Sequence, residues 1–454
     1  MPVEFLPPLP YSLQSHPWRT VVLDALCAAL NAVNGEQAVC QNLHLEGDQL
    51  WVGEQRFPLE PRGRLAVLAV GKAAVAMARG AKAVLGERVS QGLIVTKFLP
   101  QDELAPFPVM LGDHPIPKQR SLRAAQAVGR FLKSLQPGDT LLCLISGGAS
   151  ALLTLPRSPL RLRDLQKTTQ LLLRCGATIY ELNTLRKHLE RLKGGGIVKS
   201  VNSVRVISLI ISDVIGDAVE VIGSGMTTAD PTTFGDAIEV IDRYELRRLI
   251  PPSVLEYLLQ GAQGLYPETL KPNEVAPDRV LNHVIASNRH ACEAAQRSLQ
   301  SSGVEVFYLT SYLQGEASQV GRVFAAFARH LCATRSASAP PLCWIAGGET
   351  TVTVRGNGIG GRNSEVALGA VAEMSGLERA LLITLASDGD DGFSPAAGAV
   401  VNGSTATRAS QMGLSPGAFL KRNDSYTFFN RLQDCLYTSP THTNVNDLIF
   451  LFIG

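Results

Sequence analysis

Short apolar runs rich in valine, isoleucine and leucine alternate with amphipathic helical patterns along most of the chain. In the first half, short runs dominated by apolar residues predict buried strands over 64–70, 92–96, 140–145 and 204–212. The spacing of apolar positions between them predicts helices over 73–85 and 122–135. Strands that are apolar on both faces and separated by helices are typical of a parallel sheet covered on both sides. The pattern therefore predicts an α/β fold, in which a ligand lies beyond the carboxyl ends of the strands.

The alternation resumes after residues 261–279, a segment with three prolines and no periodicity. Beyond it the pattern predicts a helix over 317–331 and strands over 280–287, 304–311, 341–348, 380–389 and 447–454. A chain of 454 residues exceeds one ordinary core. We therefore predict two α/β domains, residues 1–270 and 271–454. A break at 333–341 is the competing boundary.

Composition limits the class of protein. The chain is 45% hydrophobic and 18% charged, with 42 basic and 40 acidic side chains, so the balance of charge argues against nucleic acid as the main partner. No apolar run approaches the roughly 20 residues that span a bilayer, and the proline-rich N-terminus lacks the features of a signal peptide. The eight cysteines are scattered without metal-binding spacing. A cytoplasmic protein without a membrane partner is expected.

Two strand-to-helix turns carry residues suited to an anion. Lys72 follows Gly71 at the end of a predicted strand and precedes an alanine-rich helix. A lysine at a helix N-terminus is unfavourable against the helix dipole unless an anion lies nearby. The second turn, residues 146–150 with the sequence SGGAS, offers backbone N–H groups that glycine leaves accessible. A solvated lysine and a glycine turn without a ligand are the alternative interpretations.

Two further segments offer charged groups. Asp213 follows the strand over 204–212, where a carboxylate suits a metal ligand or a general base, although aspartate also favours such turns for local hydrogen bonding. The basic pattern over 181–196 predicts a helix with Asn183 as its cap and Gly194 as its stop. Most of its charges complement the helix dipole, and Lys187 and Lys193 are kept as possible ligand contacts.

The stretch AGGETTVTVRGNGIGGRNSE, residues 346–365, combines six glycines with two arginines. Its glycines include a GxGxxG pattern, which suggests a dinucleotide site. Arg362 follows at once where a small apolar residue is expected, and Asp388 lies 27 residues after Gly361, not the roughly 20 that the dinucleotide pattern requires. An arginine in a glycine loop suits a bidentate clamp on phosphate or carboxylate.

An acidic turn follows the strand that begins at residue 380. It contains Asp388, Asp390 and Asp391 in the sequence SDGDDG. Clustered carboxylates beside a basic glycine loop fit a Mg²⁺ site that holds nucleotide phosphates. The alternative is an acidic surface turn.

Together these stretches carry a family resemblance. The motifs SGGASALL, LNTLRKHLERLKGG, SDVIGD, GGETTVTVRG, NDSY and PTHTNVNDL resemble, in this order, those of the class II glycerate 2-kinases, also called the MOFRL family. The resemblance runs from about Gly71 to the C-terminus. It implies a Rossmann-like N-terminal domain, a smaller α/β C-terminal domain and an active site in the cleft between them. It also implies transfer of the ATP γ-phosphoryl group to D-glycerate, giving 2-phosphoglycerate.

The resemblance and the chemistry of the individual residues together suggest their roles. Lys72 and Arg362 match the basic residues of the family's active site and would neutralise the transferring group and the substrate carboxylate. Asp213 is the candidate acceptor of the hydroxyl proton, and Asp388 and Asp391 are the candidate Mg²⁺ ligands. The candidate substrate- and nucleotide-binding residues are Ser146, Gly147, Gly148, Ser150, Lys187, Lys193, Glu349, Gly360, Gly361 and Asn446. A homodimer is a candidate assembly.

Two other classes of function stay open at this point. Members of the family have also been labelled hydroxypyruvate reductases, for which the GxGxxG pattern would hold NAD(P)H. A metabolite-binding protein without catalysis would bind its ligand without turnover. The kinase predicts formation of ADP with glycerate, and the reductase predicts oxidation of NAD(P)H with hydroxypyruvate.

Overall fold

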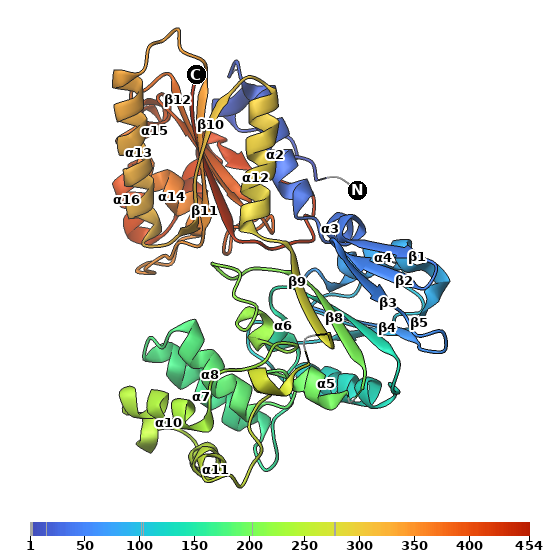
Figure 1. Ribbon diagram of the computed structural model, residues 1–454. Helices are drawn as coiled ribbons and strands as arrows, with labels where there is room; N and C mark the ends of the chain where they lie inside the picture. Colours follow the sequence, from blue (N-terminus) through green and yellow to red (C-terminus); the bar gives the residue numbers. More distant parts are fainter. Residues whose placement is uncertain (1–2, 15, 101, 103, 202, 277) are drawn as a thin grey trace. The chain divides into compact units, whose positions relative to one another are not determined.

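The computed structural model describes residues 3–14, 16–100, 102, 104–201, 203–276 and 278–454. The chain forms two compact units, residues 35–285 and residues 1–34 together with 286–454 (Figure 1). The predicted division after residue 270 differs from this in two places. Strand β9 (Val280–Ala286) extends the sheet of the first unit, and the N-terminal helices belong to the unit that contains the C-terminus.

The unit of residues 35–285 is built on a sheet with the order β6-β5-β4-β7-β8-β9. Besides β9 its strands are β4 (Leu65–Val70), β5 (Val89–Thr96), β6 (Val109–Leu111), β7 (Thr140–Ile145) and β8 (Arg205–Ile211). The pairs β4–β5, β5–β6, β4–β7 and β7–β8 are parallel. Every residue of β4 and β7 is buried, because helix α5 (Gln119–Lys133) packs on one face and α4 (Ala74–Leu85) also contacts these strands. The predicted parallel sheet is confirmed.

The order of the strands reverses between β4 and β7. Successive strands β4, β5 and β6 add in one direction, and β7, β8 and β9 add in the other. The loops that leave β4 and β7 therefore diverge, and open α/β sheets bind their ligands at such a switch point. Lys72 follows β4 and the turn of residues 146–150 follows β7, so the topology places both predicted anion-binding turns there.

Two parts of this unit, apart from the helix predicted over 181–196, are not anticipated by the sequence pattern. A small antiparallel sheet has the order β1-β2-β3, with strands Leu43–Glu46, Gln49–Val52 and Gln55–Pro58. A helical group with its own core contains α7 (Leu162–Arg174), α8 (Ile179–Leu189), α10 (Phe234–Arg243) and α11 (Pro252–Ala262). The shorter helices are α3 (Gly35–Asn42), α6 (Ala149–Leu152) and α9 (Gly196–Ser200).

The predicted ends of the helix over 181–196 are wrong. Helix α8 begins at a capping box in which Thr178 and Glu181 exchange hydrogen bonds. Asn183 lies inside the helix, and its amide donates to the backbone oxygen of Val221. The helix ends at Leu189, before the glycines. A threonine followed three residues later by glutamate is the sequence signal that identifies this start.

The second unit contains a mixed sheet with the order β10-β11-β15-β12-β13-β14. Its strands are β10 (Glu305–Leu313), β11 (Leu342–Gly348), β12 (Ala380–Ala386), β13 (Gly398–Asn402), β14 (Cys435–Leu436) and β15 (Asp447–Ile453). The pair β10–β11 is parallel, and β15 runs antiparallel to both β11 and β12. The predicted strands are confirmed. Their apolar pattern indicates burial on both faces, but it does not indicate that β15 runs antiparallel to its neighbours.

Helices cover both faces of this mixed sheet (Figure 1). Ile449 and Leu451 of β15 share a core with α13 (Ala317–Thr334) and α14 (Arg362–Ala370). Phe450 and Phe452 point to the other face, toward Leu26 of α2 (Arg19–Ala32). Helix α2 packs on α12 (Asn288–Ser301). The remaining helices are α1 (Tyr11–Gln14), α15 (Thr405–Gln411), α16 (Pro416–Arg422) and α17 (Ser425–Leu432). Among the described residues, no helix has the length and apolar character needed to cross a membrane.

A buried ion pair anchors the N-terminal helices to their unit. The carboxylate of Asp434 pairs with Arg408 and accepts hydrogen bonds from the backbone N–H and the hydroxyl of Ser12, at 2.8 and 3.1 Å. Burial raises the pKa of Asp434, and the Arg408 guanidinium opposes this effect. The pair therefore depends on the hydrogen bonds that the buried Asp434 carboxylate accepts.

We expect Asp434→Ala to lower the free energy of unfolding by about 3 kcal/mol, because it leaves Arg408 and the Ser12 N–H group without their acceptor. Asp242→Ala is the matched control, since the Asp242–Arg247 pair is exposed and surface pairs contribute about 1 kcal/mol or less. Urea denaturation monitored by circular dichroism measures both variants. Equal losses in the two variants would contradict a special role for the buried pair.

Candidate active site

The loops after β4 and β7 are fastened to each other. The N–H of Lys72 donates to the backbone oxygen of Gly147 at 2.9 Å, and the N–H of Ala73 donates to the hydroxyl of Ser146 at 3.0 Å. Gly71 has a φ of 134° and its backbone lies against Ser146, so a side chain at position 71 would collide with the neighbouring loop. These contacts fix the backbone of Lys72 at the switch point of the sheet.

Three polar side chains surround the glycines of the second loop. A Cβ atom on Gly147 would lie 2.3 Å from a carboxylate oxygen of Asp213. A Cβ atom on Gly148, which has a φ of 82°, would lie 3.1 Å from the ring of His114 and 3.4 Å from the Cγ atom of Lys72. The structure therefore brings Lys72, Asp213 and the two glycines together and adds His114.

The positive charge at this switch point comes from lysine and not from His114. Burial lowers the pKa of His114 to about 4, and the ammonium groups of Lys72 and Lys97 add to the effect. His114 is therefore neutral at physiological pH. It follows β6 within the sequence GDHPIP. Because β6 spans only Val109–Leu111, its apolar pattern is too short to predict a strand and to identify His114 as a strand-end residue.

The serines of the second loop hold the fold together. The Ser146 hydroxyl is occupied by the N–H of Ala73. The Ser150 hydroxyl lies 2.7 Å from that of Ser224, which donates to the Asn183 side chain at 2.9 Å. These contacts account for both predicted serines structurally. The other two predicted residues of the turn, Gly147 and Gly148, lie next to Lys72.

Lys187 and Lys193 are buried in internal ion pairs. Lys187 is 4% exposed and donates to Asp230 at 3.2 Å, while Lys193 is 1% exposed and pairs with Glu190. Burial lowers the pKa of Lys193 to about 8, although Glu190 opposes the shift. Buried charges of this kind are retained only when paired. Both lysines were predicted as possible ligand contacts, and in the structure each forms an ion pair with an internal carboxylate.

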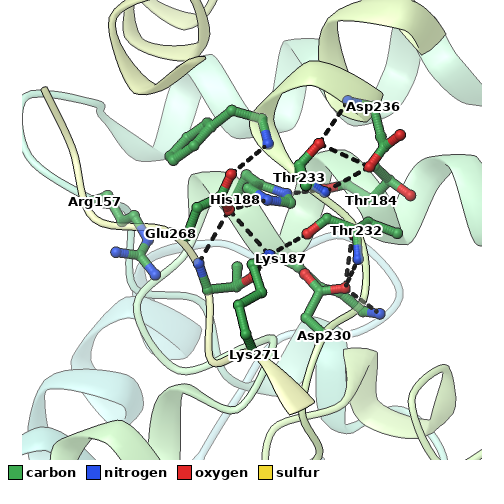
Figure 2. Close-up of polar contacts among 12 residues, drawn as sticks. Arg157, Thr184, Lys187, His188, Asp230, Thr232, Thr233, Asp236, Glu268 and Lys271 are labelled. Carbon is green, nitrogen blue, oxygen red and sulfur yellow. Dashed lines mark hydrogen bonds and ion pairs between the residues drawn. The ribbon is translucent and has the colours of Figure 1, made fainter. Parts of the chain in front are cut away.

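Figure 2 shows the polar network around Lys187. The ring of His188 is fully buried and lies 2.8 Å from the backbone oxygen of Thr184 and 3.0 Å from the Glu268 carboxylate. Hydrogen bonds from His188 and from the N–H of Phe234 lower the pKa of Glu268 to about 2 and outweigh its burial. The network joins α8, the start of α10 and the segment around Glu268, so it stabilises the helical group.

The second unit gathers charged residues at the start of α14. Arg362 pairs with Glu349, and its Nε atom lies 3.0 Å from a carboxylate oxygen of Asp447. Burial opposes the charged guanidinium, but Asp447 and Glu349 outweigh burial and raise the pKa of Arg362. The Arg362 fork is thus held between an acid after β11 and an acid at the start of β15.

Asp447 is a candidate site residue that the sequence analysis missed. It accepts a hydrogen bond from the Asn363 side chain at 2.8 Å, and burial raises its pKa to about 7 although Arg362 opposes the shift. Carboxyl groups with such perturbed values cluster at functional sites. The sequence holds a signal that could have identified it. Asp447 directly follows Asn446, which was already a candidate binding residue, and it begins a strand whose other residues are all apolar.

Asp391 caps helix α14. One carboxylate oxygen accepts from the N–H and side chain of Asn363 at 2.9 and 3.3 Å, and the other accepts from the N–H and hydroxyl of Ser364 at 2.8 and 2.6 Å. Burial raises the pKa of Asp391 despite these bonds. Donors therefore occupy both oxygens of this predicted metal ligand.

The glycines before α14 are required by close packing. A Cβ atom on Gly360 would lie 2.2 Å from the Ser425 hydroxyl, and one on Gly361 would lie 2.4 Å from the backbone of Asp391. The N–H of Gly361 donates to the Ser364 hydroxyl at 3.1 Å. These two predicted binding residues thus have a structural role in seating Arg362 at the helix start.

The other predicted residues of this unit lie at strand ends. Asp388 follows β12, and Asn446, with a φ of 67°, precedes β15. The backbone oxygen of Asn446 accepts from the N–H of Ser387 at 3.1 Å. Across the part of the chain that the structure describes, no three histidine, cysteine, aspartate or glutamate side chains are grouped to hold a metal ion.

Glu365 on α14 gives this unit a pH-dependent stability. Burial raises its pKa to about 7, although the Asn423 side chain donates to it at 3.1 Å. The pKa of Glu365 is higher in the folded state than in the unfolded chain. Its protonated side chain therefore contributes fully to the free energy of unfolding below about pH 4, and this contribution is lost as the pH rises through about 7.

We expect Glu365→Gln to make the protein more stable than the wild type at pH 8 by about 2 kcal/mol, with little difference at pH 4.5. Glu378→Gln is the control, because Glu378 is an exposed glutamate of the same unit. Urea denaturation at the two pH values measures the effect. The idea fails if the difference between Glu365→Gln and wild type is the same at both.

Comparison with known proteins assigns the family. Residues 21–259 match a Domain of unknown function (DUF4147), and residues 342–447 match the MOFRL family. A protein named glycerate 2-kinase from Pyrococcus horikoshii is 38% identical over 96% of this chain and 97% of its own. A putative hydroxypyruvate reductase from Agrobacterium vitis is 37% identical over 88% of this chain and 89% of its own.

A solved structure shares the fold. The crystal structure of glycerate kinase from Thermotoga maritima superposes with a TM-score of 0.83 at 34% identity, covering 96% of this chain and 99% of that one. Both family matches, their order along the chain and the extent of these relatives agree with the motifs found in the sequence. The chain belongs to the MOFRL family of class II glycerate 2-kinases.

Proposed function

We propose that this protein is a glycerate kinase that transfers the γ-phosphoryl group of ATP to D-glycerate and forms 2-phosphoglycerate. The observation that carries the proposal is the position of Lys72. Its backbone is fixed at the switch point of a parallel sheet, and its side chain borders Gly148 and a histidine held neutral by burial and lysine charge. A cation beside a glycine turn at this place suits phosphate groups.

The names of relatives support the same activity. The Pyrococcus horikoshii protein is named for the 2-kinase reaction and matches nearly the full length of this chain. In the proposed reaction a hydroxyl oxygen of glycerate bonds to the γ-phosphorus while the bond to the β,γ-bridging oxygen breaks, releasing ADP. Such catalysis consists mainly of positioning and of neutralising the charge on the phosphoryl oxygens.

The residues of the two units have separate proposed tasks. Lys72 would neutralise the transferring group, and Asp213, whose carboxylate lies against Gly147, would accept the proton of the substrate hydroxyl. Arg362 would bind an anionic group of the substrates through its planar fork. Glu349 and Asp447 would orient that fork, since both already contact it.

Mg²⁺ would supply positive charge that offsets the charge on the phosphates of ATP. The residues present fit a cation that is held mainly by substrate phosphates and water, because Mg²⁺ commonly takes only one or two protein carboxylates. Asp388 remains the proposed protein ligand. Asp391 fits a positioning role better, since both of its oxygens accept hydrogen bonds from the start of α14.

The reductase alternative is less well supported. In a dinucleotide fingerprint the glycine turn joins a strand directly to a helix. Here β11 ends at Gly348 and α14 begins at Arg362, so a long loop separates the two. The glycines at the end of this loop pack against Ser425 and Asp391.

The decisive experiment is to incubate the purified protein with D-glycerate and Mg-ATP and to identify the product by phosphorus NMR. We expect the signal of 2-phosphoglycerate to appear together with ADP. A 3-phosphoglycerate signal would support the glycerate kinase activity but would show that a different hydroxyl of glycerate accepts the phosphoryl group. Oxidation of NADPH by hydroxypyruvate without any ADP formation would overturn the proposal in favour of the reductase.

A further inference from the structure

A hollow of about 450 Å³ lies in the unit of residues 35–285, beside the strand-end residues described above. Its walls come from the segment after β5 and from the segment between β6 and α5. Binding sites for ligands of nucleotide size are typically a few hundred Å³ and combine an apolar wall with a few polar groups. Three features of this hollow match that description.

The first feature is an apolar wall that faces water. Phe98 is 70% exposed, Leu99 is 64% exposed and Ile116 is 46% exposed, and all three line the hollow. A group of large exposed apolar side chains around one concavity marks a binding surface more often than a single exposed one does. The flat ring of Phe98 offers a surface on which a planar aromatic base can stack.

The second feature is positive charge at the rim. Lys97, Lys118 and Arg120 line the hollow with a single acid, Asp113, among the lining residues. Asp113 accepts from the side chain and the N–H of Arg120 at 2.8 and 3.0 Å, so its charge is compensated. The Lys97 ammonium lies 4.8 Å from the centre of the Phe98 ring, which places a cation next to the apolar wall.

The third feature is the link to Lys72. His114 lines the hollow, and its ring lies beside Gly148, as does the side chain of Lys72. The hollow and the glycine turn therefore share one wall. A ligand seated in this hollow therefore lies next to the apolar wall and to Lys97, and it can reach the glycine turn beside Lys72 along the shared wall.

We propose that this hollow binds the nucleoside of ATP, with the adenine base against Phe98 and Ile116 and the phosphates directed toward Lys97 and Lys72. The inference rests on the proposed kinase function and identifies the part of the chain that recognises the nucleotide. The other substrate is glycerate, a small polar acid without a surface that would cover Phe98, Leu99 and Ile116.

The test compares Phe98→Ala with Leu265→Ala, an exposed apolar residue of the same unit outside the hollow. Isothermal titration calorimetry on the full chain measures ATP, adenosine and inorganic tripolyphosphate. We expect Phe98→Ala to weaken ATP and adenosine about tenfold, in the range of one lost base-stacking contact, and to leave tripolyphosphate unchanged. Lys97→Gln is expected to weaken ATP and tripolyphosphate but not adenosine, whereas the surface control Lys133→Gln changes none of the three.

Steady-state kinetics separates this inference from the kinase proposal. We expect KM for ATP to rise about tenfold in Phe98→Ala, while KM for glycerate stays within twofold of wild type. If the wild type phosphorylates glycerate but Phe98→Ala keeps its ATP affinity, the inference is overturned and the kinase stands. A rise in KM for glycerate alone would also overturn it. If Phe98→Ala loses ATP affinity while the wild type forms no phosphoglycerate, the hollow is supported and the kinase proposal is not.

Discussion

Replacing Lys72 with alanine is expected to lower kcat for glycerate phosphorylation by a factor of about 10² to 10³, the usual effect of removing one group that stabilises developing charge. The half-buried side chain lies beside Gly148 and His114, where exclusion of water strengthens its interaction with phosphoryl oxygens. The coupled formation of ADP measures the loss. Lys72→Arg is expected to recover part of the rate because it keeps the positive charge, although the larger fork fits the same space less well.

The matched control is Lys82→Ala. Lys82 lies in the last turn of α4, the helix that follows Lys72, and is exposed. Its removal changes the net charge equally, so an equal loss of rate in both variants would assign the effect to long-range electrostatics. A turnover of Lys72→Ala within a few-fold of wild type would remove Lys72 from the proposed mechanism.

His114 provides a second readout of Lys72→Ala that does not depend on activity. After burial, the charges of Lys72 and Lys97 are what lower the pKa of His114. Loss of the Lys72 ammonium should therefore raise the pKa of His114 from about 4 toward its ordinary value. Titration of the histidine ring by NMR measures this change, and an unchanged pKa would contradict the electrostatic effect of Lys72 on His114.

Local sequence patterns predicted the parallel sheet well and indicated which strand-end residues form its candidate site. Six apolar positions in a row in β4, and five in β7, leave few alternatives to a buried strand. The carboxyl ends of such strands meet at one edge, so the order of strands and loops along the chain is enough to group Lys72, Asp213 and the glycines at 147 and 148. The sequence could not show that His114 joins them, because β6 is too short to leave a pattern.

Charge alone was a poor guide to the environment of Lys187 and Lys193. Lys187 lies on a strongly basic helix, but its partner Asp230 is on a loop before α10 and keeps it buried. Lys193 has its partner three residues away at Glu190, a spacing at which side chains of a helix meet. The pair nevertheless lies after the end of α8, where helical spacing gives no guidance.

Long-range packing also decided which residues belong together. Residues 1–34 precede the first unit in the chain but pack with the C-terminal unit, because Asp434 binds Ser12 and α2 lies on α12. No local feature of the N-terminal sequence indicates these partners. Asp447 was missed for a related reason, since its perturbed pKa results from burial beside Asp391 and Glu349, which lie far from it in the sequence.

Replacing Arg362 with alanine is expected to lower kcat for glycerate phosphorylation about 10³-fold, as found when an arginine that neutralises a phosphoryl transition state is removed. The fork is held by Glu349 and Asp447 at the start of α14, so its direction is fixed before substrate binds. Arg362→Lys should recover little, because a lysine cannot reproduce the two parallel hydrogen bonds of a guanidinium. Arg355→Ala, an exposed arginine of the same loop, is the control and should retain most of the activity.

A structural role of Arg362 is separable from a catalytic one. Arg362 lowers the pKa of Asp447 against the effect of burial, so without the guanidinium Asp447 becomes protonated more readily and no unpaired buried charge remains. Arg362→Ala should therefore cost the folded state little at pH 6 and more at pH 8. If kcat falls about 10³-fold at pH 6 while urea denaturation shows a folded protein of nearly wild-type stability, the loss belongs to the reaction. If activity is lost only at the pH values where stability is lost, Arg362 acts by holding Asp447 and α14 in place, and the anion must be bound by other groups.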